Sequence, residues 1–203
     1  MLFRSSLGLF VRRATNQPLD ETWGLLFDSA RQPGPFILLE DARFTIGAAL
    51  WYKGLSANTT NAADLAGVRD LLVGAKERSL GFEGYTGCKN RVLSRGAVAT
   101  IAVNGDAARG IAEDPGTAFF VPREGSGKFM GTLSVSAAAP HRDLAEKFIN
   151  FILEPRVAAR FAKYSQLSTP NRAAGFSVQA DRPLTKYRSE EHTSELQSRG
   201  LIS

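Results

Sequence analysis

The sequence predicts an α/β fold, in which short apolar strands alternate with amphipathic helices. Two stretches are typical of buried strands, because residues 36–39 are all apolar and residues 97–103 are all small or β-branched. Apolar residues recur at spacings of three and four over 41–52, 61–72 and 141–153, which is the helical period. Strands and helices that alternate along one chain indicate a layered α/β domain.

The first elements follow from short local signals. Residues 21–28 predict a short helix in which Trp23 and Phe27, one turn apart, pack on each other. After the strand at 36–39, Asp41 is the expected N-cap of the helix that runs to Tyr52.

The middle of the chain combines a helix with a glycine-rich segment. Asn61 and Asp64 open a helix whose apolar face is expected to lie in the core: Leu65, Val68, Leu71 and Leu72. We expect residues 81–89 to form a glycine-rich loop and residues 91–95 a short helix that Gly96 stops.

A junction between strand and helix follows at Asn104, Gly105 and Asp106. It places backbone N–H groups and a helix N-terminus beyond the carboxyl end of the strand at 97–103. That arrangement makes Asn104 and Asp106 candidate ligand-binding residues, although Asp106 also suits a simple helix cap.

The last elements are two further strands and a pair of helices. We expect strands at 119–122 and 133–138, separated by a loop at 123–128. The helix over 141–153 is followed by a second helix, and Pro155 suits its first turn because proline lacks the N–H that this position leaves unpaired.

Composition excludes several function classes. At 43% hydrophobic and 22% charged, with no apolar run of about 20 residues, the chain does not insert into a membrane. The net charge of +5 comes from scattered basic residues without interleaved aromatics, so we expect no nucleic-acid partner. One cysteine and two histidines argue against a disulfide, a metal site or a histidine triad, and we expect no cofactor and no enzyme activity.

Residues 139–171, APHRDLAEKFINFILEPRVAARFAKYSQLSTPN, carry a family resemblance. With blocks upstream at 38–50, 54–60, 104–107 and 121–125, they resemble bacterial extracellular solute-binding proteins of ABC transporters, closest to the spermidine/putrescine-binding family. The resemblance implies a type 2 periplasmic-binding fold, present here as one nearly complete lobe plus part of the other.

The resemblance also implies a division of the chain. Residues 1–14 would be a crossover segment from a missing first lobe, 15–128 the second α/β lobe, and 129–187 a partial first-lobe segment with exposed apolar helix faces. Residues 188–203 resemble the translation of a sequencing adapter and are expected to be an artefact. A signal peptide would precede Met1 in the parent protein.

The candidate ligand-binding residues come from this resemblance and from the junction described above. They are Asp41, Phe44, Val103, Asn104, Asp106, Phe129, Gly131 and Leu167. Asp41 matches one carboxylate of the family, whereas Phe44 and Gly131 stand where the family has acidic residues that hold amines. Asp41 also suits a helix cap, and Phe44 and Phe129 also suit core packing. An unpaired buried ammonium is costly, so these replacements favour a smaller, less cationic or partly apolar solute.

The expected function is capture of a small solute by the substrate-binding component of an ABC transporter. Its partners would be the solute and a membrane permease, and the parent protein would be periplasmic. The alternative is the ligand-sensing domain of a transcription regulator with the same fold, which would require a helix-turn-helix upstream.

Overall fold

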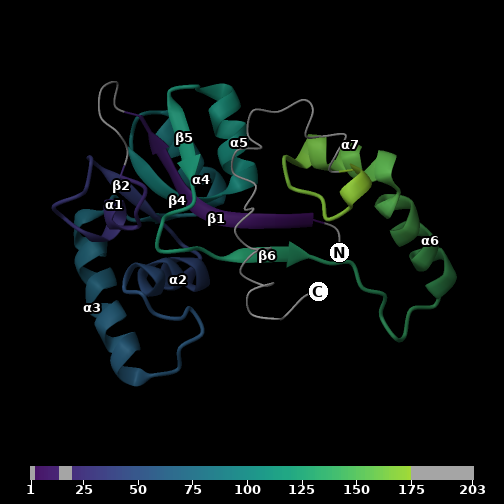
Figure 1. Cartoon of the computed structure of the whole chain (residues 1–203), viewed down its shortest axis with the longest axis horizontal. Helices are drawn as coiled ribbons and strands as arrows, with labels where there is room; N and C mark the ends of the chain where they lie inside the picture. The colour runs from purple at the N-terminus through teal and green to yellow at the C-terminus, as the bar shows by residue number, and fades with distance from the viewer. Residues whose placement is uncertain (1–2, 14–19, 175–203) are drawn as a thin grey trace.

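A six-stranded sheet forms the centre of the computed structural model, which describes residues 3–13 and 20–174 (Figure 1). The strand order is β3-β2-β4-β1-β5, and β6 pairs with β1 beyond this path. The strands are β1 (Phe3–Arg12), β2 (Phe36–Leu39), β3 (Phe82–Glu83), β4 (Ala99–Val103), β5 (Thr117–Phe120) and β6 (Lys128–Gly131).

Strand β1 is the long strand at the centre of the sheet, and its two halves have different partners. Residues 7–12 pair antiparallel with β4 on one side and β5 on the other, whereas residues 3–6 pair antiparallel with β6. Strands β2 and β4 are parallel, as are β2 and β3. A single antiparallel strand therefore lies within an otherwise parallel sheet and also extends beyond it.

Five helices pack on or around this sheet. They are α1 (Gly24–Phe27), α2 (Ala42–Tyr52), α3 (Ala62–Arg78), α4 (Tyr85–Leu93) and α5 (Asn104–Glu113). Helices α4 and α5 contact each other and the central strands, whereas α1 contacts β4 and the helices α2 and α3. Strands that are buried on both faces need helices on both sides of the sheet, and these helices provide that cover.

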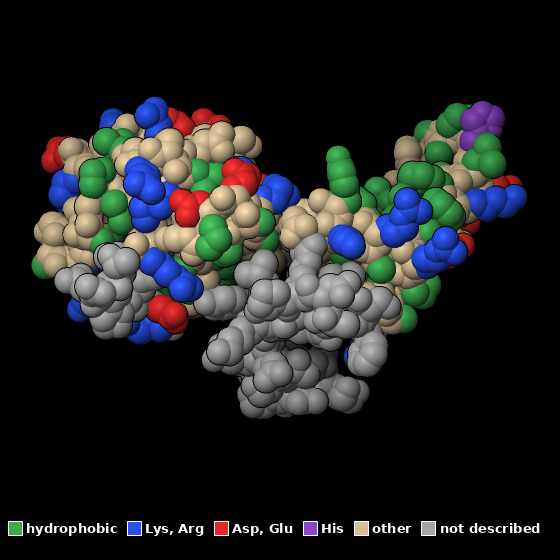
Figure 2. Space-filling view, turned by 90° about the horizontal axis from the view of Figure 1, so that it is seen from above, with side chains coloured by type: hydrophobic (Ala, Val, Ile, Leu, Met, Phe, Trp, Pro, Cys, Tyr) green, Lys and Arg blue, Asp and Glu red, His purple; other side chains and the backbone are tan. Residues whose placement is uncertain are grey.

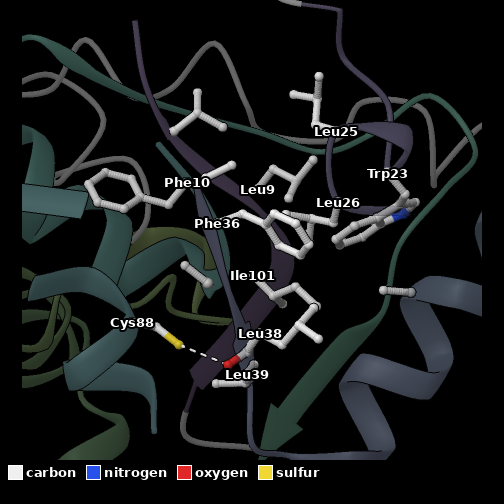
Figure 3. Close-up of a cluster of buried hydrophobic side chains, with 14 of the residues drawn as sticks. Leu9, Phe10, Trp23, Leu25, Leu26, Phe36, Leu38, Leu39, Cys88 and Ile101 are labelled. Atoms are coloured by element: carbon white, nitrogen blue, oxygen red, sulfur yellow. Dashed lines mark hydrogen bonds between the residues drawn. The ribbon is translucent and has the colours of Figure 1, made fainter. Parts of the chain in front are cut away.

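The core lies on both faces of β1, because neighbouring side chains of a strand point in opposite directions. Figure 3 shows Leu9 near Leu26 and Trp23, with Phe10 on the other side of the strand. A Cβ at Gly110 of α5 would lie 2.6 Å from the Phe10 ring, so this glycine lets α5 approach the sheet closely. The residues that form this hydrophobic core therefore all lie between positions 7 and 120.

Helices α6 (Arg142–Leu153) and α7 (Pro155–Ser165) form an arm that extends away from the sheet (Figures 1 and 2). In this described segment α6 has no buried residue, and its apolar side chains Leu144, Phe148 and Phe151 are 63%, 57% and 54% exposed. The expectation of an exposed apolar face is confirmed for α6 but not for α7, where Ala158 and Ala162 are buried and Val157 and Phe161 are half-buried.

Most predicted elements are present with small shifts of their ends. The strands at 36–39 and 99–103 are buried throughout, Asp41 caps α2, and Pro155 is the first residue of α7. The division into lobes stays a prediction, and the proposed artefact at 188–203 lies outside the described residues.

Three local predictions were wrong. Residues 81–89 form β3 and the start of α4 rather than a loop. Residues 133–138, all of them described, contain no strand; β6 at 128–131 takes that role because it meets the free half of β1. Trp23 stacks on Trp51 of α2, with ring centroids 6.3 Å apart, and the Phe27 ring is tilted against Tyr52 of α2 at 5.9 Å, rather than Trp23 and Phe27 pairing with each other.

The predicted core face of α3 is only partly buried. Val68 is 2% exposed, whereas Leu65 is 40% exposed. Within residues 3–13 and 20–174, no helix combines the length and the apolar character that crossing a membrane requires.

Candidate functional site

Polar side chains gather where the parallel strands β2, β3 and β4 end. Asp41 follows β2, Tyr85 follows β3, and Asn104 directly follows β4. The carboxyl ends of parallel strands meet at one edge of a sheet, which is where open α/β sheets bind ligands. The site predicted from the sequence therefore lies at this edge.

Asp41 is held by two donors at the start of α2. Its Oδ1 accepts a hydrogen bond from the Phe44 N–H at 3.2 Å, and its Oδ2 accepts one from the Tyr85 hydroxyl at 2.8 Å. Burial, the hydrogen bond to Asp41 and the charges of Asp41 and Asp106 raise the pKa of Tyr85. The phenol consequently stays protonated and remains a donor to the carboxylate.

Asn104 and Asp106 are both engaged within the protein. Asn104 Oδ1 accepts from the Ser5 hydroxyl at 2.6 Å, which ties the start of α5 to β1. Asp106 forms an ion pair with Arg109, and Arg109 Nη1 also donates to the Ser165 carbonyl oxygen at 2.9 Å. The charge of Asp106 is therefore neutralised by a cation of its own helix.

Four rings form a row beside Asp41, which we term the aromatic row: Phe3, Phe129, Phe44 and Tyr85. Phe44 lies 5.6 Å from Phe129 and 6.4 Å from Tyr85 between ring centroids, and Phe129 meets Phe3 edge-on at 6.5 Å. Phe44 and Phe129 also pack against the core while remaining only partly buried. The row can cover an apolar group of a ligand without leaving its own packing.

The remaining predicted residues have structural neighbours of their own. A Cβ at Gly131 would overlap the Phe3 ring, so an aromatic side chain fills the space that a larger residue at position 131 would need. Leu167 packs closely on Gly105, because a Cβ added to Gly105 would lie 2.8 Å from Cδ2 of Leu167.

Val103 differs from the other predicted residues. It is only 8% exposed and pairs with Leu7 in the sheet. The structure thus joins Asp41 to Phe44 by a hydrogen bond and Phe44 to Phe129 by a ring contact, whereas Val103 lies in the hydrophobic core. That these residues bind a ligand stays a prediction.

Sequence reasoning missed Tyr85, Ser5 and Phe3. Tyr85 lies in the stretch expected to be a loop. The two β1 residues contact partners far along the chain: Ser5 and Asn104 are 99 positions apart, and Phe3 and Phe129 are 129 − 3 = 126 apart. No local signal pointed to these residues, because the position of Tyr85 beside Asp41 also depends on the register of β2 and β3.

An open groove of about 340 Å³ lies elsewhere, between α2, α3 and β3. Its lining is mostly apolar, with Ile46, Leu72 and Phe82 in the wall and Arg69 and Lys76 among the lining residues. The edge beside Asp41 is the better candidate, because its polar atoms are held in fixed positions by hydrogen bonds. Among the described residues, no group of three or more histidine, cysteine or acidic side chains could hold a metal ion.

Comparison with known proteins defines the class. The sequence pattern of the family described as bacterial extracellular solute-binding protein matches residues 3–183, so the chain belongs to this family.

Two binding proteins are similar to this chain over most of its length. The chain is 31% identical over 161 residues to the putrescine/cadaverine-binding protein of Pseudomonas aeruginosa, covering 75% of this chain and 45% of that protein. It is 31% identical over 143 residues to the spermidine/putrescine-binding periplasmic protein of Escherichia coli K12, covering 70% and 40%. The chain spans less than half the length of these curated relatives.

A solved structure supports the fold. The spermidine/putrescine ABC transporter substrate-binding protein of Streptococcus pneumoniae superposes with a TM-score of 0.74 at 21% identity, over 98% of this chain and 66% of that one. The predicted α/β fold of periplasmic binding proteins, present here in part, is confirmed.

Proposed function

We propose that this chain is part of the substrate-binding component of an ABC transporter. It holds a small solute at the edge of the sheet beside Asp41 and, in the periplasm, presents it to a membrane permease. Family membership supports this role, and so do the carboxylate and the aromatic row at the carboxyl ends of β2 and β3. The chain acts by binding rather than by catalysis.

The single observation that carries the solute class is the number of carboxylates without a cation. Of the two carboxylates at the predicted site positions, Asp41 accepts hydrogen bonds only from neutral donors among the described residues, whereas Asp106 is paired with Arg109. Phe44 and Gly131 supply no charge at the family's acidic positions. A di- or triamine would leave an ammonium group without a counter-charge, which costs several kcal/mol on burial. The solute is therefore a small molecule with at most one amine and an apolar body.

Calorimetric titration of the 203-residue chain tests this proposal. We expect a monoamine with an aromatic body, 2-phenylethylamine, to bind more tightly than putrescine. Submicromolar binding of putrescine or spermidine would contradict the assignment, because two ammonium groups would then be held where the predicted site positions supply only one carboxylate without a cationic partner among the described residues.

A further inference from the structure

Tyr85 and Asp41 are brought together by the register of two parallel strands. Leu39 of β2 pairs with Glu83 of β3, and each site residue lies two positions beyond its paired residue. Neighbouring strands are about 4.8 Å apart, so equivalent positions beyond their ends lie within reach of each other's side chains. The observed bond of 2.8 Å between the Tyr85 hydroxyl and Asp41 Oδ2 follows from this register.

This bond leaves two acceptor atoms side by side. A tyrosine hydroxyl has one proton, and Tyr85 donates it to Asp41, so its oxygen can only accept from a third group. An ionised carboxylate has about four acceptor positions, and the Phe44 N–H and the Tyr85 hydroxyl occupy two of those on Asp41. Both oxygens therefore keep capacity for a donor from a ligand.

We propose that Tyr85 is a specificity-determining residue that contacts the solute, and that its hydroxyl oxygen and Asp41 Oδ2 both accept hydrogen bonds from one ammonium group. An ammonium carries three donors and can reach two acceptors that lie 2.8 Å apart. This inference rests on the proposed function and identifies the atoms that hold the amine. It also explains why the second acceptor can be the neutral Tyr85, since the single carboxylate of Asp41 already matches the one positive charge of the ammonium group.

The surroundings of the pair favour this geometry. Tyr85 is half-buried and its ring meets Phe44 edge-on, so the hydroxyl is held in place by packing as well as by its own bond. Phe129 continues the aromatic row on the other side of Phe44, where the apolar body of the solute would lie. A primary amine with a compact apolar body fits both parts.

The experiment compares two ligands of equal charge on the 203-residue chain. 2-Phenylethylamine carries three N–H donors, whereas its quaternary analogue, trimethyl(2-phenylethyl)ammonium, carries none. Tyr85→Phe keeps the ring beside Phe44 and removes only the hydroxyl. The matched control is Tyr52→Phe, which removes a hydroxyl near Asp28 at the far end of α2. Binding is measured by calorimetric titration, and folding of each variant by thermal unfolding.

We expect Tyr85→Phe to weaken 2-phenylethylamine binding by about tenfold or more, the usual effect of losing a hydrogen bond to a charged group. Binding of the quaternary ligand, and both affinities in Tyr52→Phe, should stay unchanged. Equal weakening of both ligands by Tyr85→Phe would show that the hydroxyl only holds Asp41, and no weakening would show that it has no part; either result overturns the proposal but leaves the proposed function intact. If the unaltered chain binds neither amine, the proposed function fails with it.

Discussion

Replacing Leu9 by alanine should cost a large part of the stability of the chain. Leu9 is 0% exposed in the middle of β1, where it pairs with Ile101 of β4 and Phe120 of β5. Truncating a leucine in such a position costs about 3 to 4 kcal/mol, from lost burial and from the cavity that rigid neighbours cannot fill. Domains are stable by only about 5 to 15 kcal/mol, so the variant should remain folded but marginal.

The assay is urea unfolding followed by circular dichroism, with Leu144→Ala as the matched control. With a denaturant dependence of about 2 kcal/mol per molar urea, the Leu9 variant should lose about 1.5 to 2 M in its midpoint. Leu144 is 63% exposed on α6, so the same deletion of atoms should change stability by about 0.5 kcal/mol or less. Equal losses in both variants would refute the placement of the core around β1.

Three further outcomes are expected. Gly8→Ala should abolish or severely weaken folding, as thermal unfolding would report, because a Cβ there overlaps the Phe120 carbonyl oxygen; a normal melting temperature would argue against this packing. Hydrogen bonds from Arg123 lower the pKa of Asp20 below 3.8, so its contribution is present above that pH and is lost as the pH falls through the lowered value. Asp20→Asn should therefore flatten the acid limb of a plot of urea midpoint against pH, and an unchanged limb would exclude the ion pair as a source of acid sensitivity. Phe44→Glu adds a second carboxylate at a helix position that favours glutamate, and calorimetry should show about tenfold tighter putrescine binding, whereas an unchanged affinity would place residue 44 outside the site.

The sequence correctly predicted the strands and helix ends that depend on neighbouring residues alone. The all-apolar run at 36–39 is buried on both faces, and Asp41 caps the next helix through the bond that its residue type predicts. The prediction for residues 81–89 was wrong because their glycines were interpreted as loop residues. In the structure Gly87 admits the Glu83 side chain, since a Cβ there would overlap it, so glycine serves close packing at this point.

The site could be predicted only where one stretch of chain carries it. Asp41 and Phe44 lie within one helical turn, and the structure joins them directly through the Phe44 N–H bond to Asp41. The Ser5 bond to Asn104 joins residues far apart, and the Phe3 ring meets Phe129 only because β6 returns to β1. Such pairs depend on sheet register, which single-residue patterns do not contain.

The central position of β1 has a consequence for how the chain folds during synthesis. β1 is translated well before its partners, because Leu7 pairs with Val103 and Phe3 with Gly131, separations of 103 − 7 = 96 and 131 − 3 = 128 residues. At a ribosomal rate of about 5 to 20 residues per second, roughly 5 to 20 s pass before the first of these partners exists. Throughout that interval an apolar strand waits unpaired, and contacts of such long range also form slowly. A nascent chain of this design therefore leaves β1 without its sheet partners until β4, β5 and β6 have been translated.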